Sequence, residues 1–170
     1  MEEVLNTLQR YLSALEKYEQ GDTSTLKQIG EIKQLKDQLA IWLDDSDQAI
    51  RAFAATMLGI SADQTYAPQL AKLLVRKDQK SDLLIYDRGA AARALGLLQA
   101  KEYGKALVTL LSSTNEYDRG GAVQGLGWMG DKEYAKAVAQ LLDDKDENIR
   151  EAAKQALEMM GASELIKDKK

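Results

Sequence analysis

The stretch EYDRGGAVQGLGWMGDKEYAKAVAQLL, residues 116–142, repeats the pattern of an earlier one, YDRGAAARALGLLQAKEYGKALVTLL, residues 86–111. Both place glycines inside segments that are otherwise typical of helices. Four arginines mark the same position in successive copies, at spacings of 37, 31 and 31 residues: Arg51, Arg88, Arg119 and Arg150. A leucine follows seven residues after each of them: Leu58, Leu95, Leu126 and Leu157. Such self-similarity predicts a stacked repeat array.

Each copy predicts two helices. The first carries small residues three and six positions after its arginine, with the leucine one position further on, which forms one helical stripe. The second has apolar residues at i, i+4, i+7 and i+8, as at Tyr103, Leu107, Leu110 and Leu111. Asp47, Asn115 and Asp146 stand four residues before their arginines, where a side chain caps a helix.

The repeat predicts a single domain of about five helical hairpins with nine main helices. We expect a degenerate N-terminal unit at 1–45, in which a helix occupies about residues 2–19. Full units follow at 46–76, 82–112 and 115–143, then a truncated C-terminal capping unit at 146–166 and a charged tail at 167–170. The insertion between the first two full units falls in VRKDQKSD, which we expect to be a surface loop.

The segments AIRAFAATMLG, DRGAAARALG, DRGGAVQGLG and NIREAAKQALE resemble the short HEAT-like repeats first associated with phycobilisome lyases. The resemblance covers about residues 24–166. It implies an all-α fold, a right-handed α-solenoid in which first helices lie outside and second helices line the concave side. A single hairpin cannot bury its apolar stripe alone, so neighbouring hairpins must cover it.

Composition excludes several kinds of site. The chain has no cysteine and no histidine, so disulfides, thiolate nucleophiles, Cys or His zinc sites and Ser-His or Cys-His pairs are absent. We therefore expect a non-catalytic protein without cofactor or metal. A formal charge of -4 argues against non-specific binding of nucleic acid. The sequence has neither an apolar run long enough to span a bilayer nor a visible export signal, so we expect a cytoplasmic protein. The alternative is a mature exported form whose leader has been removed, which would show the same pattern.

Two central units carry a Tyr-Asp-Arg set where the other units have an aliphatic residue before the arginine. These sets should lie side by side along one edge: Tyr86, Asp87, Arg88, Tyr117, Asp118 and Arg119. One interpretation is a binding strip, since tyrosine and arginine are favoured at interfaces. The other, which we favour, is structural: each aspartate caps its helix and pairs with the arginine of an adjacent unit.

The glycines of the helix near Trp128 have two explanations. Gly120, Gly121, Gly125 and Gly127 each cost about 1 kcal/mol against alanine. We favour close approach of a neighbouring helix; the alternative is a partner that lies on the backbone. Trp128 aligns with aliphatic positions of the other units, so we predict that it is part of the core.

The second helices predict a mildly basic concave lining that includes Lys72, Lys105, Lys136 and Gln140. The leading hypothesis is therefore a protein-protein interaction scaffold that binds a partner, such as an acidic segment, through this groove and the Tyr-Asp-Arg edge. The alternative, from the family resemblance, is a bilin lyase-like or chromophore-handling subunit. Asp87, Asp118, Tyr86 and Tyr117 would then be the acid-base candidates.

Overall fold

The computed structural model describes residue 6 and residues 35–76 and 86–167, and within these ranges the chain is helical with no strand. The predicted helix at 2–19 and the VRKDQKSD loop beyond residue 76 lie outside the described residues. The first helices are α3 (Gln48–Ile60), α5 (Asp87–Leu97), α7 (Glu116–Met129) and α9 (Glu147–Met159). The second helices are α4 (Ala67–Leu74), α6 (Gly104–Leu110) and α8 (Ala135–Ala139).

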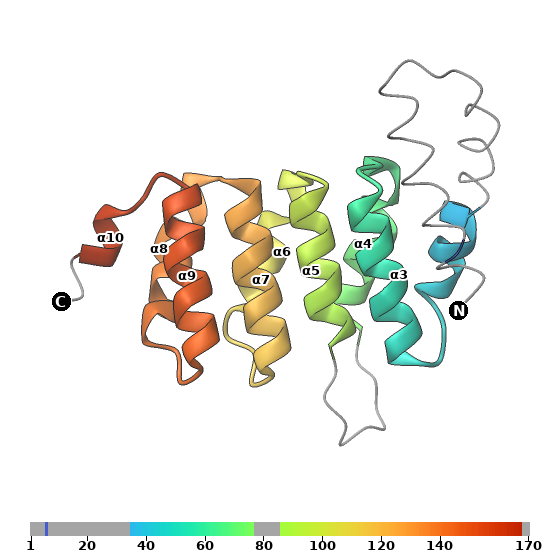
Figure 1. Cartoon of the computed structure of the whole chain (residues 1–170), viewed down its shortest axis with the longest axis horizontal. Coiled ribbons are helices and arrows are strands. Elements are labelled where there is room, and N and C mark those ends of the chain that lie inside the picture. The colour runs from blue at the N-terminus through green and yellow to red at the C-terminus, as the bar shows by residue number, and fades with distance from the viewer. Residues whose placement is uncertain (1–5, 7–34, 77–85, 168–170) are drawn as a thin grey trace, which may run out of the picture.

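These helices form a single stack of hairpins. The first helices stand in one row, and α4, α6 and α8 form a second row behind them (Figure 1). Short 3-10 turns lead into the second helices at Gln64–Tyr66, Lys101–Tyr103 and Lys132–Tyr134, and another, Gln140–Asp143, extends α8. Helical residues 35–42 precede α3, and α10 (Glu164–Lys167) follows α9. The predicted all-α solenoid is confirmed.

Local sequence signals explain where the first helices begin and end. The side chains of Asp47, Asn115 and Asp146 accept backbone N–H bonds at the starts of α3, α7 and α9, as predicted. A left-handed residue follows each first helix, always eleven positions after the arginine: Ala62, Gln99, Gly130 and Gly161. Glycine takes this conformation without strain, but alanine and glutamine do not.

The core is the seam between the two rows. The repeated leucines Leu58, Leu95, Leu126 and Leu157 are all fully buried, which confirms the stripe read from the sequence. They belong to one continuous cluster that runs from Leu35 to Ala162. No unit has a closed core of its own, as expected for a solenoid.

Polar side chains also tie each unit to the next. A side chain beyond each first helix donates to a backbone carbonyl at the end of the following one: Gln64 to Leu98 (2.8 Å), Gln99 to Trp128 (2.5 Å) and Lys132 to Gly161 (2.9 Å). These bonds repeat with the period of the stack. They satisfy carbonyls that the helix itself leaves open.

The two rows are not equally close-packed, and this determines the curvature. Each first helix packs along the next, α3 on α5, α5 on α7 and α7 on α9, whereas contacts between α4 and α6 are sparse. In a curved stack the tighter row lies on the inner side. We infer that the first helices line the inner side of the curve, opposite to the arrangement expected from the family resemblance.

Candidate functional site

A ladder of buried ion pairs connects the first helices. Arg51 Nε donates to Asp87 Oδ2 at 2.6 Å, and Arg88 Nη2 donates to Asp118 Oδ2 at 2.5 Å. Each aspartate thus takes the arginine of the preceding unit. Asp87 and Asp118 are both buried, so the pairs lie inside the stack.

The third pair uses a different acceptor. Ile149 occupies the aspartate position of the last unit, and Arg119 bonds instead to Asp144 in the preceding loop, through Nε (2.7 Å) and Nη2 (2.9 Å). The Arg119 guanidinium holds the pKa of the Asp144 carboxyl below its usual value. Burial has the opposite effect on Asp118 and raises its pKa despite the bonds from Ser113 and Arg88.

The arginines also organise the turns before their own helices. Arg51 Nη1 donates to the backbone carbonyls of Asp45 and Ser46, at 2.8 and 3.0 Å. Arg119 and Arg150 make the same pair of bonds to their preceding loops. Arg51, Arg119 and Arg150 therefore have the same structural role in their units.

Only some of the six residues of the predicted Tyr-Asp-Arg strip are accessible at the surface. Asp87, Asp118 and Arg119 lie beneath the surface, and Arg88 is partly exposed. Tyr86 is half-buried against the core, and its ring lies 6.1 Å from that of Tyr117 in a tilted arrangement. Tyr117 is 43% exposed, so it is the most accessible of the six residues. The aspartates support this edge from below and do not form its surface.

Close packing explains most of the glycines of α7. A Cβ on Gly121 would lie 2.2 Å from the carbonyl oxygen of Gly89, and one on Gly125 would lie 2.3 Å from that of Ala92. A Cβ on Gly127 would meet the Cβ of Ala156 at 2.8 Å. The prediction of close helix approach is confirmed at these three positions.

Gly120 is different, because space is available there. The nearest atom to a Cβ at this position is Ile149 Cγ1 at 3.8 Å, an ordinary contact. Close approach of a neighbouring helix therefore does not explain this glycine. Its backbone lies on a narrow open strip of α7 that also contains Glu116, Tyr117, Gln124 and Trp128, while every other residue from 116 to 129 is buried.

The prediction that Trp128 is part of the core is wrong. The tryptophan is half-buried at the end of this open strip and is not part of the core. Its equivalents are Ile60, Leu97 and Met159, which are 56%, 42% and 54% exposed. The four residues form an apolar row across four consecutive units, which we call the apolar ridge. The position is apolar in each unit, but it faces solvent because it lies opposite the second helices.

Arg93 was not predicted as a site residue. It lies one turn before Leu97 on α5, is exposed, and has no ion-pair partner among the residues that the structure describes. The available signal was its position in the repeat, because Arg93 lies five residues after Arg88 and aligns with Gln124, five residues after Arg119. We call the open strips of α3, α5, α7 and α9, including the ridge and Arg93, the inner face.

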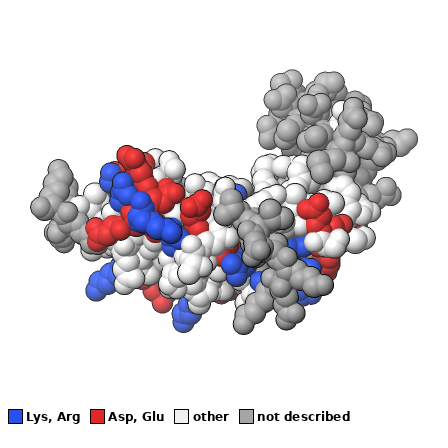
Figure 2. Space-filling view, turned by 90° about the horizontal axis from the view of Figure 1, so that it is seen from below, with Lys and Arg blue, Asp and Glu red and all other residues white. Residues whose placement is uncertain are grey.

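The predicted basic lining lies on the opposite side. Lys72, Lys105, Lys136 and Gln140 are exposed on the second-helix row, as expected, but this row is the outer side of the curve. Figure 2 shows the molecule from below, with cations and anions interspersed and no continuous basic stripe on the visible described atoms. The chain offers isolated lysines here, each spaced by one unit.

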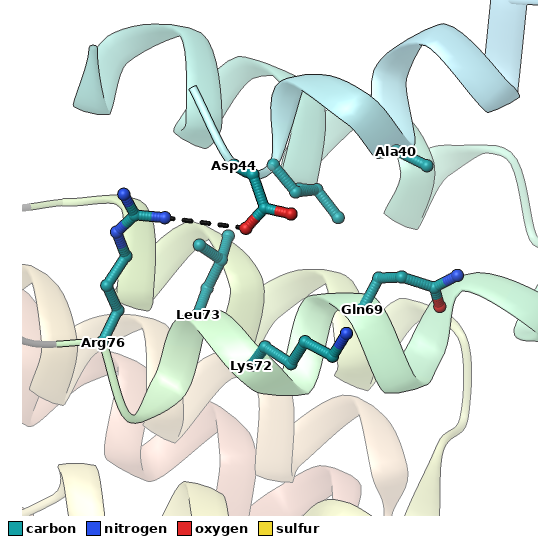
Figure 3. A pocket seen from close by; sticks show the side chains of 7 residues that line it. Ala40, Asp44, Gln69, Lys72, Leu73 and Arg76 are labelled. Atoms are coloured by element: carbon teal, nitrogen blue, oxygen red, sulfur yellow. Dashed lines mark ion pairs between the residues drawn. The ribbon is translucent and has the colours of Figure 1, made fainter. Parts of the chain in front are cut away.

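One small cavity lies between helical residues 35–42 and α4. It has a volume of about 170 Å³ and is lined by Ala40, Leu43, Asp44, Gln69, Lys72, Leu73 and Arg76. Arg76 approaches Asp44 at 3.7 Å across its mouth, and Gln69 and Lys72 project from α4 beside it (Figure 3). The cavity is lined by charges of both signs and by both polar and apolar side chains, so no one ligand class is favoured.

The described residues contain no cluster of three or more acidic side chains that would hold a metal ion. Within the same part of the chain, no helix combines the length and the apolarity needed to cross a bilayer.

Comparison with known proteins agrees with the repeat. Residues 80–158 match the model of HEAT repeats. Among curated proteins, none matches the chain. A similar solved structure is the complex of CpcE and CpcF of phycocyanin lyase from Nostoc sp. PCC7120, with 28% identity and a TM-score of 0.66 over 78% of this chain. The chain spans 55% of that lyase subunit.

Two engineered proteins share the fold. One is 24% identical with a TM-score of 0.56, and the other is 23% identical with a TM-score of 0.53. Each comparison covers 78% of this chain, and 67% and 40% of the engineered proteins. Residues 80–158 are therefore HEAT repeats, and the described chain is an α-solenoid built from HEAT-like units.

Proposed function

We propose that this protein is a non-catalytic scaffold that binds another protein through its inner face. The observation that carries the proposal is the apolar ridge of four equivalent residues in consecutive units. Ile60, Leu97 and Met159 are exposed and Trp128 is half-buried. Contiguous exposed apolar surface on a folded protein is typical of an interaction site. A protein partner in the cytoplasm, and not a nucleic acid, is part of this proposal.

The surroundings of the ridge support an interface. Aromatic residues and arginine are enriched at interface centres, and Tyr117, Trp128 and Arg93 lie on this face. The first helices are held rigidly by the buried pairs Arg51–Asp87 and Arg88–Asp118, so the face is preorganised. The Tyr-Asp-Arg edge belongs to the same proposal through its exposed members, Tyr117, Tyr86 and Arg88.

Affinity capture with matched variants tests the proposal. Leu97→Glu with Met159→Glu changes the ridge, and Lys105→Glu with Lys136→Glu changes the outer row. Both pairs involve exposed residues, so each variant should fold as the wild type does by circular dichroism. We expect the ridge variant to lose the captured proteins and the outer variant to retain them.

The opposite result would favour an acidic segment on the outer row. Lys72, Lys105, Lys136 and Gln140 would then form the site, as the sequence first suggested. Capture that survives both pairs of substitutions would contradict a site on either face.

The second candidate function is chromophore handling, and the similarity to the phycocyanin lyase complex favours it. Of the acid-base candidates, Asp87 and Asp118 are buried and engaged with arginine, so Tyr117 and Tyr86 are the accessible groups. Mixing the protein with a linear tetrapyrrole and recording its absorption spectrum tests this role. An unshifted spectrum would count against it.

A further inference from the structure

We propose that the occupant of the inner face is an apolar α-helix of a partner protein that lies along the stack and places a carboxylate opposite Arg93. This inference rests on the proposed function and specifies the partner's chemistry. It follows from the period of the ridge, the charge of the inner face and the bare backbone at Gly120.

The period of the ridge matches a helix. Packed helices lie about 8–10 Å apart, which sets the step from one unit to the next along the ridge. A helix rises about 1.5 Å per residue, so side chains at i and i+7 are about 10.5 Å apart. This repeat is slightly longer than the unit spacing, so a helix that crosses the units obliquely, by about 20–30°, brings it to about 9–10 Å and meets Leu97 and Trp128 with side chains seven residues apart. An extended strand has no such simple match, because its side chains on one face recur about every 6.6 Å.

The charges of α3, α5 and α7 are almost entirely neutralised. Charged residues make up 29% of the chain. On these three helices, however, the arginines and aspartates are paired: Arg51 with Asp87, Arg88 with Asp118, and Arg119 with Asp144 from the next loop. Among the described residues, Arg93 and Glu116 are the charges of these three helices that remain without an ion pair. The end helix α9 differs, because it exposes Glu147, Glu151, Lys154 and Glu158.

Those two residual charges lie at different levels of the face. Glu116 is the first residue of α7, at the edge where the first helices begin, whereas Arg93 lies one turn before the ridge residue Leu97. Along α3, α5 and α7, a helix on this face therefore meets a cation and no anion at the level of Arg93. A carboxylate on the partner would complement it, and a lysine there would be repelled.

Gly120 supplies the third observation. Its Cβ position is open, so alanine would fit and would favour the helix by about 1 kcal/mol. Glycine instead leaves backbone bare between Tyr117 and Trp128. Gly120 lies two turns, about 12 Å, before Trp128 on α7. A partner helix is about 10–12 Å across, so one centred at the level of Arg93 reaches the ridge on one flank and the bare backbone of Gly120 on the other.

Two synthetic helical peptides of about 20 residues test the inference. Both carry leucine at i, i+3, i+7, i+10, i+14 and i+17, and they differ only in having glutamate or lysine at the flanking positions. Trp128 fluorescence in a Trp42→Phe background reports binding, because Trp42 packs against the core and Trp128 lies on the inner face. We expect the glutamate peptide to bind at least about tenfold more tightly than the lysine peptide.

Two substitutions locate the effect. Arg93→Glu should abolish or reverse the preference, whereas Lys105→Glu, the same charge change on the outer row, should leave it unchanged. Gly120→Gln should keep the fold, because the site is open and glutamine favours helix, but it should weaken binding of the glutamate peptide.

The outcomes separate this inference from the proposed function. Equal binding of both peptides, unchanged by Arg93→Glu, would overturn the carboxylate while leaving the inner face as a docking site. Binding that Gly120→Gln does not affect would overturn the placement of the helix over α7. If neither peptide binds while Leu97→Glu with Met159→Glu still abolishes capture, the helical occupant is wrong and the scaffold stands.

Discussion

Adjacent glycines in α7 should respond to alanine in opposite directions. Gly120 and Gly121 have the same helical setting, so Ala should gain about 1 kcal/mol in helix propensity at either position. At Gly120 the new methyl meets only Ile149 Cγ1 at 3.8 Å, so the gain should be retained. At Gly121 it would lie 2.2 Å from the carbonyl oxygen and 2.5 Å from the Cα of Gly89, both backbone atoms that cannot rotate away.

Relief of that overlap requires α5 and α7 to separate, which loosens the tightest interface of the stack. Overpacking of this kind typically costs about 1–3 kcal/mol. We therefore expect Gly120→Ala to raise the free energy of unfolding by about 1 kcal/mol, or roughly 2–4 °C in Tm. Gly121→Ala should lower that free energy by a similar or larger amount.

Urea unfolding followed by circular dichroism at 222 nm measures both variants against the wild type. The comparison is sound if the slope of the free energy against urea is unchanged, because a changed slope signals altered cooperativity. Destabilisation by Gly120→Ala, or neutral behaviour of Gly121→Ala, would refute the packing argument.

Three further perturbations follow from the fold. Ala62→Gly should raise the urea midpoint, by about 1 kcal/mol in free energy, because Ala62 holds a φ of 55° that glycine adopts without strain; a lowered midpoint would contradict this reason. Asp144→Asn should cost about 3 kcal/mol at pH 7, since it leaves Arg119 buried without its counter-charge. The pKa of Asp144 is lowered in the folded state, so the wild-type advantage is present above its usual value near 3.8 and should shrink as pH falls through the lowered pKa; an advantage independent of pH in urea titrations would argue against the ion pair. Leu126→Ala should cost about 2–5 kcal/mol, because this side chain is fully buried between the rows, and a loss below 1 kcal/mol in the same assay would contradict its central position.

The repeat made most of the fold predictable. The leucines seven residues after each arginine identify the core, and Asp47, Asn115 and Asp146 identify helix starts, because both signals are local and repeat in register. The left-handed turn at Ala62 and Gln99 could not be predicted, since neither residue type favours that conformation.

The candidate site was less predictable, because it depends on which row is inside. A helical stripe in the sequence distinguishes apolar from polar sides but does not show which side a neighbouring unit covers. Trp128 aligns with apolar residues of the other units and was therefore assigned to the core, although it lies with Leu97 and Ile60 on the open inner strip. Lys105 and Lys136 were correctly predicted to be exposed, but on the opposite face.

Distances between spin labels test directly whether the first helices lie inside the curve. The chain has no cysteine, so labels can be placed at will. One pair is Thr56→Cys with Gln124→Cys on the first-helix row, and the other is Lys72→Cys with Gln140→Cys on the second-helix row; each pair spans two units. Electron-spin distances should be shorter for the Thr56–Gln124 pair than for the Lys72–Gln140 pair. An equal or longer distance for the first pair would place the ridge and Arg93 on the outside and contradict the proposed docking face.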